Sequence, residues 1–234
     1  MPTNIKNKTE DFLMAAKIMI ENALSDNTVK TALANYGYDE AKLQAGKALY
    51  DEAFELDLVQ KKESGEKVAV TAEFNNLWAE ADQQYMKTLK VARIVLKNLY
   101  KADQSAMLYG VRKQSFNGWQ EQAVSFYANI LNDPQLLEAM AGYGYPEDKL
   151  QSEYDMVKQV IAKELQQKQE KGESEQATRV RDQKLDQLAV FISEMRGIAK
   201  VALADTPDYL EKLGILARSA GFTPRKQETA ATSE

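Results

Sequence analysis

A chain of 234 residues that is 44% hydrophobic and 28% charged can bury a sizeable core, which excludes the disordered class of protein. It has no cysteine and no histidine, which excludes disulfides, thiol catalysis, Ser-His-Asp triads and histidine-ligated zinc, haem or di-iron sites. The formal net charge of -5 disfavours nucleic acid as a bulk electrostatic partner.

The start of the chain is polar. Residues 1–10 lack the apolar core of a signal peptide. No apolar run in the chain approaches the roughly 20 residues that a bilayer-spanning helix needs. We therefore expect no membrane span and a cytoplasmic location.

An internal repeat is the strongest signal in the sequence. The turn Asn-Tyr-Gly-Tyr at 35–38 is matched by Gly-Tyr-Gly-Tyr at 142–145, an offset of 107 residues. Without any gap, that offset aligns residues 22–96 with 129–203, and 21 of the 75 pairs are identical. Because the register persists through both a turn and a loop, we interpret it as a duplication.

Each copy predicts four helices in the same order. A first amphipathic helix is followed by a short helix and then by two longer helices that form a hairpin. The expected ranges are 9–24, 26–35, 39–63 and 67–102 in the first copy, 117–131, 133–141, 146–171 and 174–203 in the second, and 206–219 for a last helix.

Turn residues set the predicted boundaries. Aspartate precedes each short helix as an N-cap, and glycine ends it in the left-handed conformation. A further glycine in each copy marks the expected bend of the hairpin. The N-cap residues are Asp26 and Asp133, the left-handed glycines are Gly37 and Gly144, and the expected bends are at Gly65 and Gly172.

Shared apolar positions on the long segments recur at steps of three, four and seven, which is typical of helices in a bundle. A single hairpin cannot cover both of its apolar faces. We therefore predict an all-α, antiparallel bundle in which the two copies pack about a pseudo-twofold axis as one domain; two small bundles in tandem are the alternative. The expected parts are a flexible N-terminus (1–8), helical repeat 1 (9–107), helical repeat 2 with the C-terminal helix (108–221) and a disordered tail (222–234).

Tyrosines flank the glycine of both repeated turns. Tyrosine supplies large, partly polar contact area, so these rings are candidates for an interaction surface. The simpler alternative is that each ring packs over the end of its own helix. The candidates are Tyr36, Tyr38, Tyr143 and Tyr145.

Two asymmetries between the copies give further candidate surfaces. Basic residues form a stripe on the second long segment of copy one, which the second copy does not repeat, and this suits an anionic partner. The alternative is favourable charge at a helix C-terminus with pairing to acidic residues. The stripe comprises Lys87, Lys90, Arg93, Lys97 and Lys101.

Apolar residues in copy one also replace polar residues of copy two. Either helices of the same chain cover this surface, or a second subunit does. The residues are Leu56, Val59, Val68, Phe74 and Leu77.

Acidic pairs such as Glu52 with Glu55, or Glu170 with Glu173, lie among lysines and glutamines, so we expect solvated faces rather than catalytic sites. No phosphate-binding glycine motif occurs. The sequence thus favours a non-enzymatic bundle, without cofactor or transition metal, that acts by self-association or as an adaptor for a protein partner. A bundle that binds a small ligand, or an enzyme relying on carboxylate, tyrosine and lysine, is the alternative.

Overall fold

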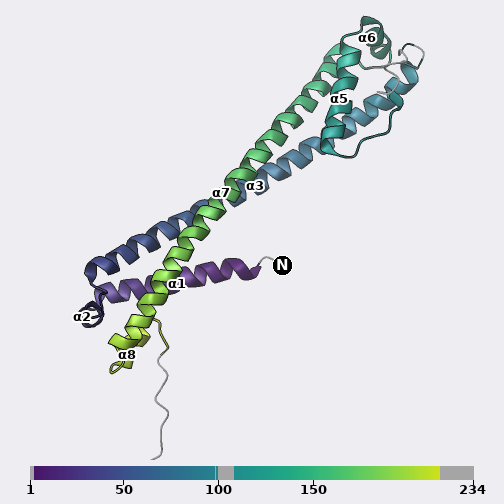
Figure 1. Cartoon of the computed structure of the whole chain (residues 1–234). Coiled ribbons are helices and arrows are strands. Elements are labelled where there is room, and N and C mark those ends of the chain that lie inside the picture. Colours follow the sequence, from purple (N-terminus) through teal and green to yellow (C-terminus); the bar gives the residue numbers. More distant parts are fainter. Residues whose placement is uncertain (1–2, 98, 100–107, 217–234) are drawn as a thin grey trace, which may run out of the picture. The chain divides into compact units, whose positions relative to one another are not determined.

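The computed structural model describes residues 3–97, 99 and 108–216, with side chains from residue 8 onward. Over these residues the chain is all-helical and has no strand (Figure 1). The helices are α1 (Thr3–Ser25), α2 (Asn27–Ala34), α3 (Glu40–Val95), α5 (Phe116–Leu131), α6 (Pro134–Ala141), α7 (Glu147–Ala202) and α8 (Pro207–Lys212). Among them we find no helix that combines the length and the apolar character needed to cross a membrane.

The ends of the chain differ from the expected boundaries. α1 begins at Thr3, so residues 3–8 are helical where we expected a flexible segment. α8 is shorter than the last helix that we expected at 206–219. The tail predicted at 222–234 lies outside the described residues.

The two short helices begin and end as predicted. Asp26 caps α2 by accepting hydrogen bonds from two backbone N–H groups at 2.9 and 3.2 Å, and Asp133 caps α6 in the same way at 2.9 and 3.4 Å. Gly37 and Gly144 follow these helices with φ of 80° and 81°. Glycine is favoured there because other residues clash in the left-handed region.

The bend predicted at Gly65 and Gly172 is wrong. α3 and α7 are each continuous over 56 residues, and both glycines lie inside a helix. A glycine costs a helix about 1 kcal/mol relative to alanine. Tertiary packing on either side of the glycine offsets that cost, because most helical stability in proteins comes from packing. The expected hairpins are therefore replaced by single long helices.

The described chain forms two compact units, and each takes a segment from both long helices. Unit 1 contains α1, α2, α3 up to Leu58, α7 from Val180, and α8. Unit 2 is Val59–Arg179, which contains the rest of α3, α5, α6 and the first part of α7. Both units therefore combine elements from the two copies of the repeat.

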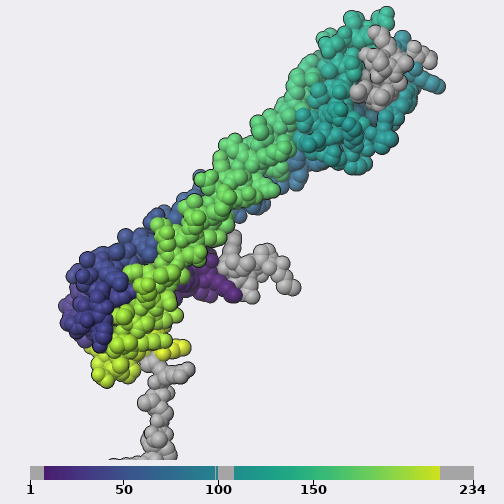
Figure 2. All heavy atoms as spheres, in the orientation of Figure 1, coloured from purple at the N-terminus to yellow at the C-terminus, as the bar shows by residue number. Residues whose placement is uncertain are grey.

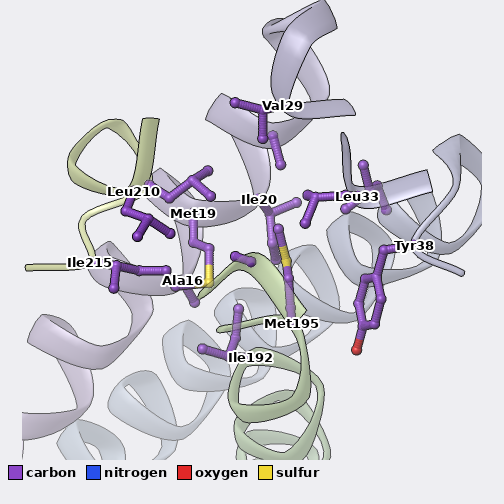
Figure 3. Close-up of a cluster of buried hydrophobic side chains, with 14 of the residues drawn as sticks. Ala16, Met19, Ile20, Val29, Leu33, Tyr38, Ile192, Met195, Leu210 and Ile215 are labelled. Atoms are coloured by element: carbon purple, nitrogen blue, oxygen red, sulfur yellow. The ribbon is translucent and has the colours of Figure 1, made fainter. Parts of the chain in front are cut away.

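The core of unit 1 is mainly aliphatic. Figure 3 shows Met19 and Met195 near its centre, with the Tyr38 ring at its edge. Helices α1, α2 and α8 supply most of the other buried side chains, against the facing segments of α3 and α7. Ten labelled members of this cluster are Ala16, Met19, Ile20, Val29, Leu33, Tyr38, Ile192, Met195, Leu210 and Ile215.

The core of unit 2 is rich in aromatic side chains. Figure 2 shows α5 and α6, in teal, gathered against the segments of α3 and α7 that belong to this unit. Tyr85 and Phe126 meet edge to face with ring centroids 5.4 Å apart, and Phe126 meets Tyr127 at 5.1 Å. Such contacts add about 0.5–1.5 kcal/mol to the stabilisation that burial provides.

Buried positions in the two units correspond at the offset of 107 residues. The smallest ones are conserved in size, since Ala16 and Ala123 are both fully buried. The larger ones change from aliphatic in unit 1 to aromatic in unit 2. Three such pairs are Met19 with Phe126, Ile20 with Tyr127, and Ile192 with Tyr85.

Candidate ligand-binding site

A cluster of four aromatic rings lies where α5 begins in unit 2. Ser115 caps α5 by accepting a hydrogen bond from the Gly118 N–H at 3.3 Å, which fixes the first turn of the helix. The next two aromatic side chains on α5 then face two from α3. The cluster comprises Phe74 and Trp78 of α3 and Phe116 and Trp119 of α5.

The two tryptophans of this cluster line a pocket of about 230 Å³. Their ring centroids are 5.9 Å apart at an interplanar angle of 61°. The pocket is bounded by α3 on one side and by the segment that leads into α5 on the other. Its lining residues are Asn75, Trp78, Ala79, Asp82, Arg112, Lys113, Gln114 and Trp119.

Side-chain contacts hold the segment that forms the second wall. The amide of Gln122 accepts a hydrogen bond from the Lys113 N–H at 3.0 Å and donates one to the Val111 carbonyl at 2.8 Å. Arg112 forms an ion pair with Asp82, and the Lys113 ammonium pairs with Glu121. These contacts fasten the segment to α3 and α5.

Two polar atoms at this pocket are buried without a hydrogen-bond partner among the described residues. They are Oδ1 of Asp82, whose other oxygen pairs with Arg112, and Nε1 of Trp119, a residue that is 2% exposed. Buried polar groups in folded proteins are nearly always paired, because an unpaired one costs about 1–3 kcal/mol. The pocket therefore presents one acceptor and one donor that a bound molecule could satisfy.

Unit 1 has a pocket of about 260 Å³ at the corresponding place, but with different chemistry. Phe12 stands there where unit 2 has Trp119, and Ala189 stands where it has Asp82. Trp78 is replaced by Leu185. The aromatic N–H and the carboxylate are thus particular to unit 2.

A second polar feature of unit 2 surrounds Glu153. Its Oε2 atom accepts a hydrogen bond from Thr88 at 2.6 Å and another from Tyr127 at 3.0 Å, and both donors are fully buried. Burial, together with the nearby carboxylate, raises the pKa of Tyr127 well above its ordinary value. The counterparts in unit 1 are Gly46, Met195 and Ile20, so the network has no equivalent there.

Glu153 also lines a shallow pocket of about 540 Å³. Two of the residues singled out in the sequence, Lys87 and Tyr145, meet in this pocket. Lys149 lies over the Tyr145 ring, with its Nζ 3.6 Å from the ring centroid. The pocket carries two ammonium groups and two carboxylates, which leaves it with no dominant charge. The lining residues are Gln84, Lys87, Tyr145, Asp148, Lys149, Ser152 and Glu153.

Three glutamates of unit 2 bring carboxylate oxygens within 4.8 Å of one another: Glu63 and Glu66 of α3 and Glu170 of α7. Oxygen ligands of this kind suit Mg²⁺ or Ca²⁺. Glu66 is already 3.5 Å from the Lys62 ammonium, and it is exposed. The cluster fits the solvated acidic surface expected around Glu170.

The tyrosines of the two turns divide into two pairs. Tyr36 and Tyr143 are 49% and 66% exposed, so their rings are accessible to a partner. Tyr38 is 2% exposed and donates a hydrogen bond to Glu194 at 3.3 Å, so it is a core residue and not a contact surface. Tyr145 is half-buried against the core of unit 2.

The basic stripe is largely solvent-facing. Lys87, Lys90 and Lys97 are exposed, whereas the guanidinium of Arg93 donates a hydrogen bond to the Leu108 carbonyl. Lys101 lies outside the described residues.

The apolar residues of copy one do not share one surface. Phe74 is 5% exposed beneath Phe116, and Leu77 packs against the same core. Leu56 is half-buried, and Val59 and Val68 are exposed. Val68 follows Val59 by nine residues, which places it about 180° away around the helix.

Comparison of the chain with models of protein families, with curated proteins and with solved structures gives no match. The pocket lined by Trp78 and Trp119 was not predicted from the sequence. Its signal was present in the repeat, because Trp78, Asp82 and Trp119 replace Leu185, Ala189 and Phe12 at equivalent positions.

Proposed function

We propose that this protein is a non-enzymatic binding protein whose ligand site is the pocket between Trp78 and Trp119 in unit 2. The observation that carries the proposal is the pair of unpartnered buried atoms, Asp82 Oδ1 and Trp119 Nε1, on residues that line one pocket. A pocket with apolar walls and a few convergent polar groups is the usual form of a small-molecule site. Because Arg112 holds the other oxygen of Asp82, this carboxylate is better suited to orienting a ligand than to transferring a proton.

We also infer that the two copies form a tandem repeat with a pseudo-twofold relation. The bounds of α2 and α6, and of α3 and α7, agree at the offset of 107 residues. Gln60 donates a hydrogen bond to Thr178, and Gln167 donates one to Thr71, both at 3.4 Å. The offset converts the first pair into the second, as an antiparallel pairing of equivalent helices would require. On this inference, duplication produced two pockets, and the pocket of unit 2 became polar.

Blocking the pocket tests the proposed function. Ala79→Phe places a ring in the pocket from an exposed position on α3, and Asp186→Phe does the same in the corresponding pocket of unit 1. One-ring aromatic fragments, detected by ligand-observed NMR, should bind the wild type and Asp186→Phe but not Ala79→Phe. The proposal fails if no fragment binds, or if Ala79→Phe binds as the wild type does.

A second candidate function is that of an adaptor with an acidic protein partner. It is favoured by one observation: Lys90, Ile94 and Lys97 share a face of α3, and Ile94 is 76% exposed between the two lysines. An apolar side chain flanked by cations suits an acidic surface with an apolar centre. The double change Lys90→Glu with Lys97→Glu should abolish such binding, and an unchanged affinity for the partner would reject the adaptor function.

A further inference from the structure

We infer that the ligand of the Trp78–Trp119 pocket is a neutral, one-ring aromatic compound carrying a carboxamide, that is, an N–H donor beside a carbonyl acceptor. This inference rests on the proposed function, because it names the chemical class that the same pocket would take. Size, charge and hydrogen bonding each restrict the class independently.

The size of the pocket restricts the ligand to about one ring. A cavity of about 150 Å³ lined by apolar side chains holds a benzene molecule. The pocket of about 230 Å³ therefore has room for a ring with one small substituent. The indole rings of Trp78 and Trp119 provide aromatic walls that favour edge or face contact with a planar ligand.

The charges around the pocket favour a neutral ligand. Asp82 is neutralised by Arg112, and Lys113 by Glu121, so the two ion pairs leave no net charge. An anionic ligand would approach the Asp82 carboxylate, and a cationic ligand would approach the Arg112 guanidinium. Either one would meet a like charge close to its binding position.

The unpartnered atoms select the polar group. Asp82 Oδ1 needs a donor, and the indole Nε1–H of Trp119 needs an acceptor. A carboxamide offers both groups within one planar unit, so it can satisfy both atoms in a single orientation. Phe12 and Ala189 provide neither need in unit 1, so that pocket has no reason to prefer an amide over a hydrocarbon.

Four probes that share a ring test the class: benzamide, toluene, benzoate and benzylamine. Trp78 and Trp119 are the two tryptophans of the chain, so tryptophan fluorescence reports directly on this pocket. Benzamide should bind about tenfold more tightly than toluene, since each added hydrogen bond to a buried group is worth several-fold in affinity. Benzoate and benzylamine should bind more weakly than benzamide.

Two variants take the residues that unit 1 already has at these positions. Trp119→Phe retains an aromatic wall but removes the N–H donor, so benzamide affinity should fall toward that of toluene, as reported by Trp78. Asp82→Ala leaves the Arg112 guanidinium unpaired, so benzoate should now bind more tightly than benzamide. Circular dichroism of each variant shows whether the helices are retained, and the reversal between benzoate and benzamide cannot arise from simple loss of folding.

The possible results separate this inference from the proposed function. If toluene or benzylamine binds as tightly as benzamide, and Ala79→Phe abolishes that binding, the site is real but the ligand class is wrong. If none of the four probes changes the tryptophan fluorescence and no other one-ring fragment binds, both the class and the proposed site are rejected.

Discussion

Phe191 of α7 packs its ring directly over Gly46 of α3, within unit 1. A Cβ atom built on Gly46 would overlap Cε1 and Cζ of that ring. The equivalent residues in unit 2 are Gln84 and Glu153, which both line the shallow pocket there. The same position is thus closed by an aromatic ring in one unit and opened by polar side chains in the other.

Gly46→Ala should destabilise the protein. Alanine gains about 1 kcal/mol over glycine inside a helix, but here its methyl group must displace the Phe191 ring. Overpacking of this kind costs about 1–3 kcal/mol, so we expect a net loss of about 1 kcal/mol in the free energy of unfolding. Urea unfolding followed by circular dichroism measures the change.

Gly65→Ala and Gly172→Ala are the matched controls. At both positions an added Cβ meets nothing within 4 Å, and both residues lie inside continuous helices. Each change should raise the free energy of unfolding by about 0.5–1 kcal/mol. A loss at these positions would instead indicate that the glycines adopt a bend, as first expected from the sequence.

The sequence predicted local structure better than it predicted helix continuity. The N-caps at Asp26 and Asp133 and the left-handed glycines at 37 and 144 follow from side-chain and backbone chemistry within a few residues. Whether Gly65 ends a helix depends on a cost of only about 1 kcal/mol. Contacts made by distant segments outweigh a cost of that size, and they are not visible in the local pattern.

Alkaline pH should destabilise the protein through its buried tyrosines. Burial raises the pKa of Tyr85 to about 12, and burial together with the Glu194 carboxylate raises the pKa of Tyr38 to about 12. In the unfolded chain both phenols ionise near pH 10. Their contribution to stability is therefore complete below pH 10 and is lost as the pH rises from about 10 to about 12, with a slope of up to about 1.4 kcal/mol per pH unit for each tyrosine.

Absorbance at 295 nm and urea unfolding between pH 8 and pH 12 measure this effect. Tyr85→Phe should flatten the alkaline loss of stability, whereas Tyr36→Phe, at an exposed position, should leave it unchanged. If Tyr85→Phe has the same pH dependence as the wild type, the burial of this phenol does not govern alkaline stability.

The hydrogen bonds to Glu153 should stabilise unit 2. Glu153→Ala removes the acceptor of Thr88 and Tyr127, two fully buried hydroxyl groups, and should lower the free energy of unfolding by about 2–4 kcal/mol. Glu153→Gln keeps an acceptor oxygen of nearly the same shape and should cost less than half as much. Thermal unfolding of both variants checks the difference; equal losses would mean that the hydrogen bonds contribute little.

The candidate site could be predicted from the sequence only in part. Tyr145 and Lys87 were singled out, and the structure brings them together around Glu153. Trp78 and Trp119 are far apart in the sequence, and each has an apolar counterpart in the other copy, so both resemble ordinary core residues. What marks them is the unpartnered Nε1 atom and the neighbouring Asp82 carboxylate, and this arrangement depends on how α5 packs on α3.

Self-association through the copy-one apolar residues can be tested with substitutions on two differently exposed side chains. Val59 is 45% exposed on α3, and Phe74 is 5% exposed with its ring centroid 5.3 Å from that of Phe116. Val59→Glu should leave helicity and unfolding temperature nearly unchanged, because the new carboxylate stays in water. Analytical ultracentrifugation of the wild type and of this variant then reports on association, and a monomeric wild type would remove this function.

Phe74→Glu should act on folding and not on association. The substitution removes a ring from the aromatic core of unit 2 and buries a carboxylate without a cation beside it. Loss of a buried Phe side chain alone costs about 3–5 kcal/mol, and the unpaired charge adds to that cost. We therefore expect lower helicity and a large fall in the unfolding temperature at every protein concentration. A Phe74→Glu variant that keeps wild-type stability and changes only its sedimentation would place Phe74 at a subunit contact, against its burial beneath Phe116.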